Sequence, residues 1–313
     1  MASVPNTEPK RGNFLLDNDR FVGGMFLLPT VLYIILMVGF PFIIAILFSM
    51  SNVTSGDTSL DFVGLDNFKA VWGVASFQRA LRNSFIFTLA TQVLVIIFAN
   101  ILALVLTQNF PGKWIIRFLV LLPWATPVAL STIGWLWFLD SAFSPIDWVL
   151  RELNLLGPGT PLGPARNVVW LGKPTLARLA VIFVQAWRLT PLAAVILMAA
   201  LTSIPQDITD QAEVDGSRFF RTLFQVKLPL ILPIMLIALL FSTVFSFGDM
   251  AVVYILTRGG PVDYTQVLPT WSYEVFAEGG NLAQGAAIAL FIFPVLLAAS
   301  IVILRMASRT EIN

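Results

Sequence analysis

The stretch ITDQAEVDGSRFFRTLFQVKLPLILP, residues 208–233, is the longest charge-bearing segment between two strongly apolar parts of the chain. Its first half predicts a short helix over about Pro205–Val214, because Pro and Asp are both favourable in a first helical turn. Gly216 is expected to end this helix, since glycine adopts the left-handed cap conformation at the lowest cost. The apolar spacing predicts a second short amphipathic helix with a Phe/Leu face, made of Phe219, Phe220, Leu223 and Phe224.

The composition places the chain among integral membrane proteins. Its 313 residues are 57% hydrophobic and 12% charged, whereas soluble domains carry about 25% charged residues. A net charge of +1 and a pI of about 8.0 give no electrostatic footprint for nucleic acid, which needs a clustered basic face. The sequence has no Cys and no His, which excludes disulfides, thiolate nucleophiles, common zinc sites and Ser-His-Asp catalysis.

Six runs are long and apolar enough to cross a membrane, because about 20 residues at 1.5 Å rise span the hydrocarbon core. They cover about Phe21–Met50, Phe85–Thr107, Phe118–Leu139, Leu179–Leu201, Pro229–Leu256 and Ala286–Leu304. None of them shows the period-2 alternation of a porin strand, so the expected fold is an all-α polytopic membrane protein with six transmembrane helices. The first run is too long for the apolar part of a signal peptide, so we expect 21–50 to remain as a membrane helix.

Loop charge sets the expected orientation. An even number of spans puts both termini on one side, and the loops and tails of that side carry ten of the Lys and Arg residues. The longer outer connections carry eight. The positive-inside rule therefore predicts a cytoplasmic N-terminal tail (1–20), a cytoplasmic loop (203–228) and a cytoplasmic C-terminal tail (305–313). The core, 85–304, then contains five spans, and the fifth is expected to begin at the prolines Pro229 and Pro233.

Composition alone leaves the 208–233 stretch open to two interpretations. It could lie in the headgroup region as a re-entrant elbow, with its aromatic side chains in lipid and its arginines in water. The order of its residues favours another interpretation. Residues 210–217, DQAEVDGS, and 226–229, VKLP, resemble the EAA loop of the permeases of ATP-binding-cassette (ABC) importers. This chain departs from the pattern by carrying Asp210, Gln211 and Ser217 where Glu, Ala and Ala are usual.

The resemblance extends over nearly the whole chain from about residue 21. It includes FVGLDNFKAV (62–71), LLPWATPVAL (121–130), WRLTPLAAVILMAALTSIP (187–205) and YILTRGGP (254–261). Within the family these segments look like the permeases for sugars, polyols and glycerol-3-phosphate. The resemblance implies a type I importer permease fold in a bacterial or archaeal plasma membrane.

The resemblance also implies a division of labour. The chain would have no catalytic residue and no cofactor, because ATP and Mg are bound by a separate dimer of ATP-binding subunits. A second homologous permease and an extracytoplasmic solute-binding protein would complete the complex, the latter landing on 257–276 and 62–68. The implied coupling residues are Asp210, Gln211, Ala212, Glu213, Asp215, Gly216 and Ser217. We expect Asp210 and Glu213 on the polar face of the coupling helix, and the Phe/Leu face packed against the chain's own bundle.

Two charges lie inside the expected spans, Arg188 in the fourth and Asp249 in the fifth. An ionisable group in a membrane is costly, so these residues either line a solute path or neutralise each other. Ser246 and Phe247 flank Asp249 and share its expected role. Trp135 and Trp187 could stack on sugar rings, although Trp is also enriched at membrane interfaces as an anchor. Weaker candidates of the same kind are Trp137, Ser242 and Thr243.

Two other classes of function compete with the importer subunit. An ion-coupled secondary transporter predicts inverted repeats and coupling carboxylates in mid-membrane, and only one acidic residue is embedded here. A membrane enzyme would need a cluster of His, Asp or Glu ligands. The sequence does not choose among trehalose, maltodextrin, other oligosaccharides, polyols and glycerol-3-phosphate as solute.

Overall fold

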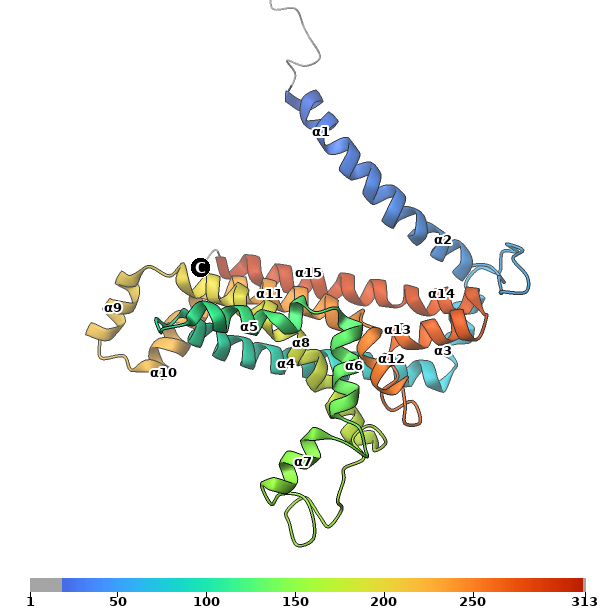
Figure 1. Cartoon of the computed structure of the whole chain (residues 1–313). Coiled ribbons are helices and arrows are strands. Elements are labelled where there is room, and N and C mark those ends of the chain that lie inside the picture. Colours follow the sequence, from blue (N-terminus) through green and yellow to red (C-terminus); the bar gives the residue numbers. More distant parts are fainter. Residues whose placement is uncertain (1–18, 312–313) are drawn as a thin grey trace, which may run out of the picture.

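The computed structural model describes residues 19–311, which fold into helices around one main bundle (Figure 1). In chain order the elements are α1 (Asp19–Ile34), η2 (Ile35–Gly39), α2 (Phe40–Ser49), α3 (Asp66–Trp72), α4 (Ala75–Thr107), α5 (Lys113–Ala125), α6 (Val128–Phe138), α7 (Pro145–Glu152), α8 (Pro174–Thr202), α9 (Gln206–Val214), α10 (Phe219–Thr222), η3 (Leu223–Lys227), α11 (Leu228–Phe247), α12 (Ala251–Thr257), α13 (Leu268–Tyr273), η4 (Glu274–Glu278), α14 (Leu282–Leu290) and α15 (Ile292–Glu311). The η elements are single π-helical turns. The expected all-helical membrane fold is confirmed.

Five continuous helical stretches in the described part of the chain are long and apolar enough to span a membrane. They are Val22–Ser49, Ala75–Thr107, Pro174–Thr202, Phe219–Phe247 and Leu282–Thr310. These stretches correspond to the expected first, second, fourth, fifth and sixth spans. A bent pair, α5 and α6, supplies a sixth span if the two helices are counted together.

The expected third span, Phe118–Leu139, is wrong as one straight helix. α5 and α6 meet at an angle of 95°. The break lies at Thr126 and Pro127, which have extended ψ angles of 137° and 130°. A proline disfavours the α conformation of the residue before it and has no N–H to continue the helix. Pro127 therefore ends α5 and lets α6 start in a new direction.

The expected boundaries of the fifth span, Pro229–Leu256, are also wrong at both ends. The helix begins earlier, at Phe219, and accommodates Pro229 after the π turn η3. A π turn absorbs a residue that cannot join the regular hydrogen-bond ladder, as prolines cannot. At the other end α11 stops at Phe247, and the residues Gly248–Met250 separate it from α12.

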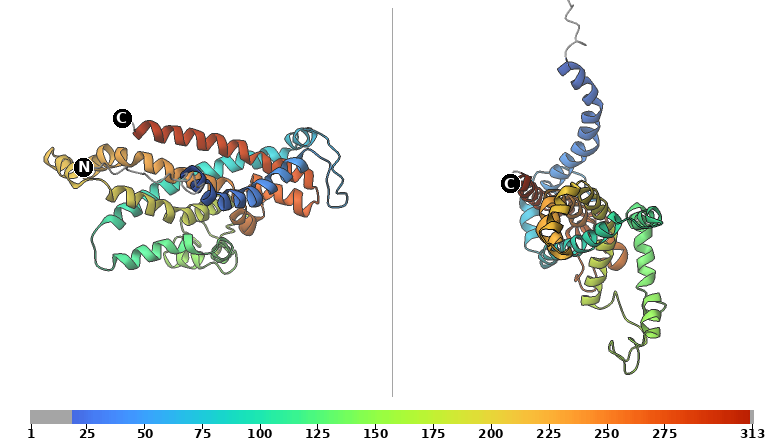
Figure 2. Two further views of the ribbon diagram at one scale, coloured as in Figure 1. Left: turned by 90° about the horizontal axis from the view of Figure 1, so that it is seen from above. Right: turned by 90° about the vertical axis from the view of Figure 1, so that its left-hand side faces the viewer.

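The core of the bundle forms where α4 and α8 pack along each other, flanked by α11 (Figures 1 and 2). Small buried residues dominate this contact, which brings the helix backbones close together as in other membrane bundles. They include Ala99 and Ala103 of α4 and Ala186, Ala193, Ala194 and Ala200 of α8. The core therefore depends on close helix packing more than on large side chains.

The first part of the first span, α1, stands away from the bundle, whereas α2 packs against α14 (Figure 1). α1 points away from the bundle on one side, and the segment with α6 and α7 leaves the bundle on the opposite side (Figures 1 and 2). None of the most apolar 18 residues of Val22–Ser49 is buried, and Phe26 is 74% exposed. Such an apolar surface is stable only in lipid or against another membrane protein.

The connection between α6 and α8 is built around one buried carboxylate rather than being a simple loop. Asp147 of α7 is 1% exposed, and its carboxylate accepts bonds from the Val168 N–H at 2.8 Å and the Trp170 Nε1–H at 2.9 Å. The Ser144 hydroxyl caps α7 by accepting the Asp147 N–H. Asp147 therefore holds the two ends of this connection together.

Replacing Asp147 by Leu is expected to loosen this connection. Two bonds to a charged acceptor are lost, each contributing about 1.5–3 kcal/mol. Amide hydrogen exchange over 165–173, followed by mass spectrometry on the purified protein, should become faster. Glu152→Ala changes an exposed carboxylate at the end of the same helix and should leave the exchange unchanged. Equal exchange in the two variants would contradict the assigned role of Asp147.

Candidate functional site

The elbow between the fourth and fifth spans projects from one end of the bundle (Figure 1). Pro205 precedes α9 with a φ of −58°, a value that the proline ring fixes. Gly216 has a φ of +76°, and its N–H donates to the Glu213 carbonyl, while the Ser217 N–H donates to the Ala212 carbonyl, both at 2.9 Å. These two bonds form a Schellman cap, for which a left-handed glycine is the favoured residue. The predicted helix and its glycine stop are confirmed.

One side of α9 faces away from the bundle and is open to a partner. Asp207, Asp210, Gln211 and Val214 recur at helical spacing and line an open hollow together with Asp215. Val214 is 88% exposed, the highest value among the exposed large hydrophobic residues in the described part of the chain. The sequence interpretation did not name Val214 or Asp207 among the coupling residues, although their helical spacing from Asp210 was visible in the sequence.

The opposite side of α9 faces the chain's own bundle. Ala212 is 9% exposed. Glu213 lines a second hollow, which also contains Lys227 and the end of α4 at Leu104. Asp210 and Glu213 are both exposed, one helical turn apart, as expected, although they border different hollows.

The second half of the elbow differs from the expected separate amphipathic helix. α10, η3 and α11 form one continuous helix, so the elbow consists of α9, a left-handed turn and the start of the fifth span. Phe219, Phe220 and Phe224 are 63%, 70% and 62% exposed. The expected packing of the Phe/Leu face against the bundle is wrong for these three side chains, and Leu223 alone of the four expected residues is buried. A helix that continues away from the bundle directs most of its side chains outward.

The two embedded charges meet in the middle of the chain's core. Arg188 of α8 donates to the Asp249 carboxylate, and their side chains are 8% and 10% exposed. Asp249 lies in the break after α11, and its other carboxylate oxygen accepts the Val252 N–H at 3.1 Å. The ion pair therefore ties α8 to the start of α12, and each charge neutralises the other, as one of the two sequence interpretations expected.

Ser246 and Phe247 lie at the same place, around a small cavity that also includes Asp249. Phe247 is 3% exposed and packs edge-on against Phe85 at 5.4 Å. Thr91 of α4 and Gln185 of α8 line this cavity as well. We name the Arg188–Asp249 pair and this cavity the polar centre. The sequence interpretation missed Thr91 and Gln185, whose signal was a polar side chain inside an apolar span.

Ser242, one of the weaker polar candidates, is hydrogen-bonded within the chain. The Ser242 hydroxyl lies within hydrogen-bond distance of two acceptors, Oε1 of Gln92 and the Leu239 carbonyl, and its one proton is shared between them. Gln92 is a further buried polar residue that the sequence interpretation missed. Ser242 therefore joins α11 to α4 as a structural contact.

The aromatic candidates form a separate group next to the polar centre. Trp135 of α6 contacts Trp187 of α8 edge to face, with ring centroids 5.4 Å apart. Trp187 also lines an apolar groove of about 390 Å³ between α4, α5 and α8. Trp137 is 59% exposed and lies outside this groove. The fold thus brings Trp135 and Trp187 together and leaves Trp137 apart.

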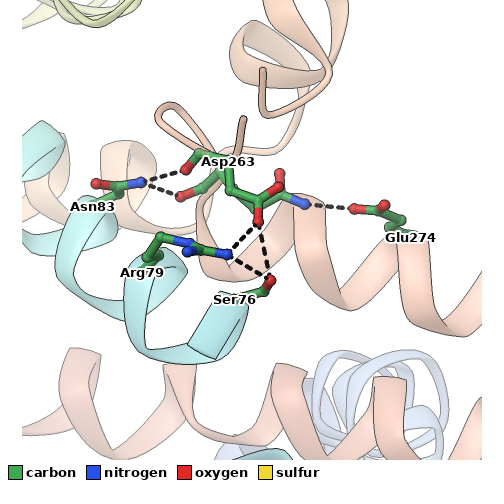
Figure 3. Close-up of polar contacts among 6 residues, drawn as sticks. Ser76, Arg79, Asn83, Asp263 and Glu274 are labelled. Atoms are coloured by element: carbon green, nitrogen blue, oxygen red, sulfur yellow. Dashed lines mark hydrogen bonds and ion pairs between the residues drawn. The ribbon is translucent and has the colours of Figure 1, made fainter. Parts of the chain in front are cut away.

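The outer turn between α12 and α13 is held rigidly (Figure 3). Asp263 accepts bonds from the Ser76 hydroxyl at 3.0 Å and from Arg79 at 2.9 Å. The Asn83 amide donates to the carbonyls of Asp263 and Gln266. These contacts fix the turn onto α4 at the end of the bundle opposite the elbow.

Gly259→Ala is expected to disrupt this turn. A Cβ at Gly259 would lie 1.9 Å from Oε1 of Gln266, and the φ of +81° is unfavourable for any other residue. The apparent Tm of the purified protein should fall by more than in Gly112→Ala. Gly112 has a similar φ of +78°, but its Cβ would meet nothing within 4 Å, so this control isolates the backbone strain. A fall of the same size in both variants would contradict the predicted clash.

Known proteins resemble this chain over almost its full length. A probable ABC transporter permease protein of Brucella suis is 24% identical, with 94% of this chain and 99% of the relative covered. The trehalose/maltose transport system permease protein MalF of Thermococcus litoralis is 27% identical, with 91% and 92% covered. The sulfoquinovosyl glycerol transport system permease protein SmoG of Agrobacterium fabrum is 26% identical, with 97% and 96% covered.

The fold also has a counterpart among solved structures. One chain of a bacterial alginate ABC transporter, solved in complex with its alginate-bound periplasmic protein, superposes with a TM-score of 0.77 at 19% identity, covering 95% of this chain and 98% of that one. The family described as "Binding-protein-dependent transport system inner membrane component" matches residues 95–311. The helical bundle and the capped elbow lie within or overlap this range. The chain therefore belongs to this family, the multi-pass permease subunits of ABC importers.

Proposed function

We propose that this permease carries a sugar, an oligosaccharide or a related polyol. The observation that supports this most is the similarity, over more than nine-tenths of the chain, to permeases named for trehalose/maltose and for sulfoquinovosyl glycerol. The pair of Trp135 and Trp187 beside a groove of about 390 Å³ is consistent with such solutes, because sugar rings stack on aromatic faces. Ser246, Phe247, Arg188 and Asp249 are proposed as residues near the solute path.

The elbow is proposed to transmit the motion of the ATP-binding subunits. ATP and Mg are bound by those subunits, and α9 seats on one of them. The face with Asp207, Asp210, Gln211 and Val214 supports this role, because it is exposed and combines carboxylates with one apolar anchor. α9 is joined through the capped turn at Gly216 to the helix of the fifth span, so a displacement of α9 is transmitted to the bundle.

The rest of the complex is proposed as follows. A second homologous permease covers part of the apolar surface of this chain, and the remainder contacts membrane lipid. A solute-binding protein docks at the end that carries the outer turn. The two tails and the elbow face the cytoplasm. The exposed α1 and α2, together with the rigid outer turn, support this arrangement.

Co-purification and transport test the function together. The chain should be isolated with a nucleotide-binding subunit and a second permease, and the reconstituted complex should take up solute only with ATP and the binding protein. Native mass spectrometry of the binding protein as purified identifies the solute. Uptake by the lone chain, driven by an ion gradient, would contradict the importer and favour a secondary transporter.

Protease access tests the orientation. The segment 158–166 is mostly exposed, whereas Gly259 of the outer turn is buried. Protease added outside right-side-out vesicles should cut within 158–166 and leave 206–218 intact. Inverted vesicles should show the reverse pattern. Cleavage of 206–218 from outside would contradict the cytoplasmic elbow.

A further inference from the structure

We propose that the polar centre contains a binding site for one buried water molecule, between α4, α8 and the break after α11. The cavity offers about 20 Å³ to the centre of a water-sized sphere. A water molecule needs about 10–15 Å³ on this measure, together with two to four polar partners. The cavity therefore has room for a water and is too small for a sugar ring. This inference concerns the chain itself and does not depend on the identity of the solute.

Gln185 is the first residue that points to water. Its side chain lines the cavity and is 5% exposed. Within residues 19–311, neither its Nε2 donor nor its Oε1 acceptor has a hydrogen-bond partner. Native proteins leave few buried polar atoms without a partner, because each such atom costs about 1–3 kcal/mol. Water satisfies this side chain well, since it both donates and accepts.

Thr91 is the second such residue and comes from a different helix. It is 0% exposed and lines the same cavity. Its hydroxyl also has no partner in the part of the chain that the structure describes. Two helices thus place unpartnered polar groups around one small space. An apolar cavity of this size would remain dry, whereas a polar cavity holds ordered water.

The Asp249 carboxylate borders the same cavity and offers a third partner. Its oxygens already accept from Arg188 and from the Val252 N–H, and a carboxylate has about four acceptor positions. Ser84, by contrast, lines the cavity with a satisfied hydroxyl, which donates to the Ala80 carbonyl and accepts the Leu268 N–H. The proposed ligands of the water are therefore Gln185, Thr91 and Asp249. The water would bridge α4 and α8 beside the ion pair.

A structure of the assembled complex tests the site directly. At a resolution that shows other buried waters, the map should contain a peak within hydrogen-bond distance of the Gln185 amide and the Thr91 hydroxyl. A map without this peak overturns the proposal.

The change in apparent Tm of Thr91→Val gives an independent test, because its sign differs with and without a bound water. If the hydroxyl binds water, its loss should lower the apparent Tm of the complex, as should Gln185→Met. If the hydroxyl has no partner, valine removes an unsatisfied polar group and should leave the Tm unchanged or raised, which overturns the proposal. Thr132→Val is the matched control, because Thr132 is 1% exposed and donates to the Val128 carbonyl at 2.7 Å. The fall in apparent Tm of Thr132→Val shows how much stability is lost with one hydrogen-bonded hydroxyl.

Discussion

Gly216→Pro is expected to abolish most ATP-driven uptake while leaving the permease inserted and assembled. Proline fixes φ near −65° and has no N–H, whereas Gly216 has a φ of +76° and its N–H donates to the Glu213 carbonyl. The cap between α9 and the fifth span cannot form in this variant. We expect uptake to fall at least about tenfold. A loss of about 1.4 kcal/mol in the free energy of coupling is sufficient for a factor of ten.

Gly216→Asn is the matched control for this prediction. Asn tolerates the left-handed conformation better than other non-glycine residues, so the cap and most of the uptake should be retained. The measurements are solute uptake and ATP hydrolysis by the reconstituted complex, with the amount of inserted permease determined in parallel. Uncoupled hydrolysis with low uptake supports the role of the elbow. Normal uptake in Gly216→Pro would exclude a rigid coupling turn, and Asp215→Lys tests the same turn through charge.

The second large effect is expected at the ion pair of the polar centre. Arg188→Leu leaves the Asp249 carboxylate buried without its partner, and Asp249→Leu does the same to the guanidinium. Breaking a buried pair in this way costs about 3–5 kcal/mol. Each single variant should therefore show a lower apparent Tm and less assembled complex.

The double variant separates neutralisation from a role in transport. With both residues replaced by Leu no charge remains buried, and replacing a buried pair by apolar residues is often neutral or stabilising. We expect the double variant to recover most of the Tm lost by the singles. Uptake that also recovers assigns the pair a structural role only, whereas uptake that stays low places the pair in the transport cycle. A double variant as unstable as the sum of the singles would contradict the pairing.

The local sequence is sufficient to predict the cap of the elbow but not the bend in the third span. The α9 cap depends on Gly216 and its immediate neighbours, so short-range preferences are sufficient to predict it. The bend of 95° between α5 and α6 depends on more than Pro127, because a proline can also kink a helix without ending it. α12 packs against α6 in the fold, and such a contact cannot be read from the residues around the proline.

The site shows the same contrast. Asp210, Gln211 and Gly216 could be assigned from their order along the chain, and Val214 could have been added from its helical spacing to Asp210. Arg188 and Asp249 are 61 positions apart. The sequence offered their pairing as one of two interpretations, and the fold shows that they meet.

By itself, the sequence determined the membrane class, the approximate positions of most spans and the glycine stop of the elbow. Each of these depends on hydrophobic run length or on the preferences of neighbouring residues, and neither requires knowledge of the fold. Only the tertiary structure decided which buried polar groups meet. Thr91, Gln185 and Asp249 come from three distant segments, and they share one cavity because the close packing of α4 and α8 places them around it.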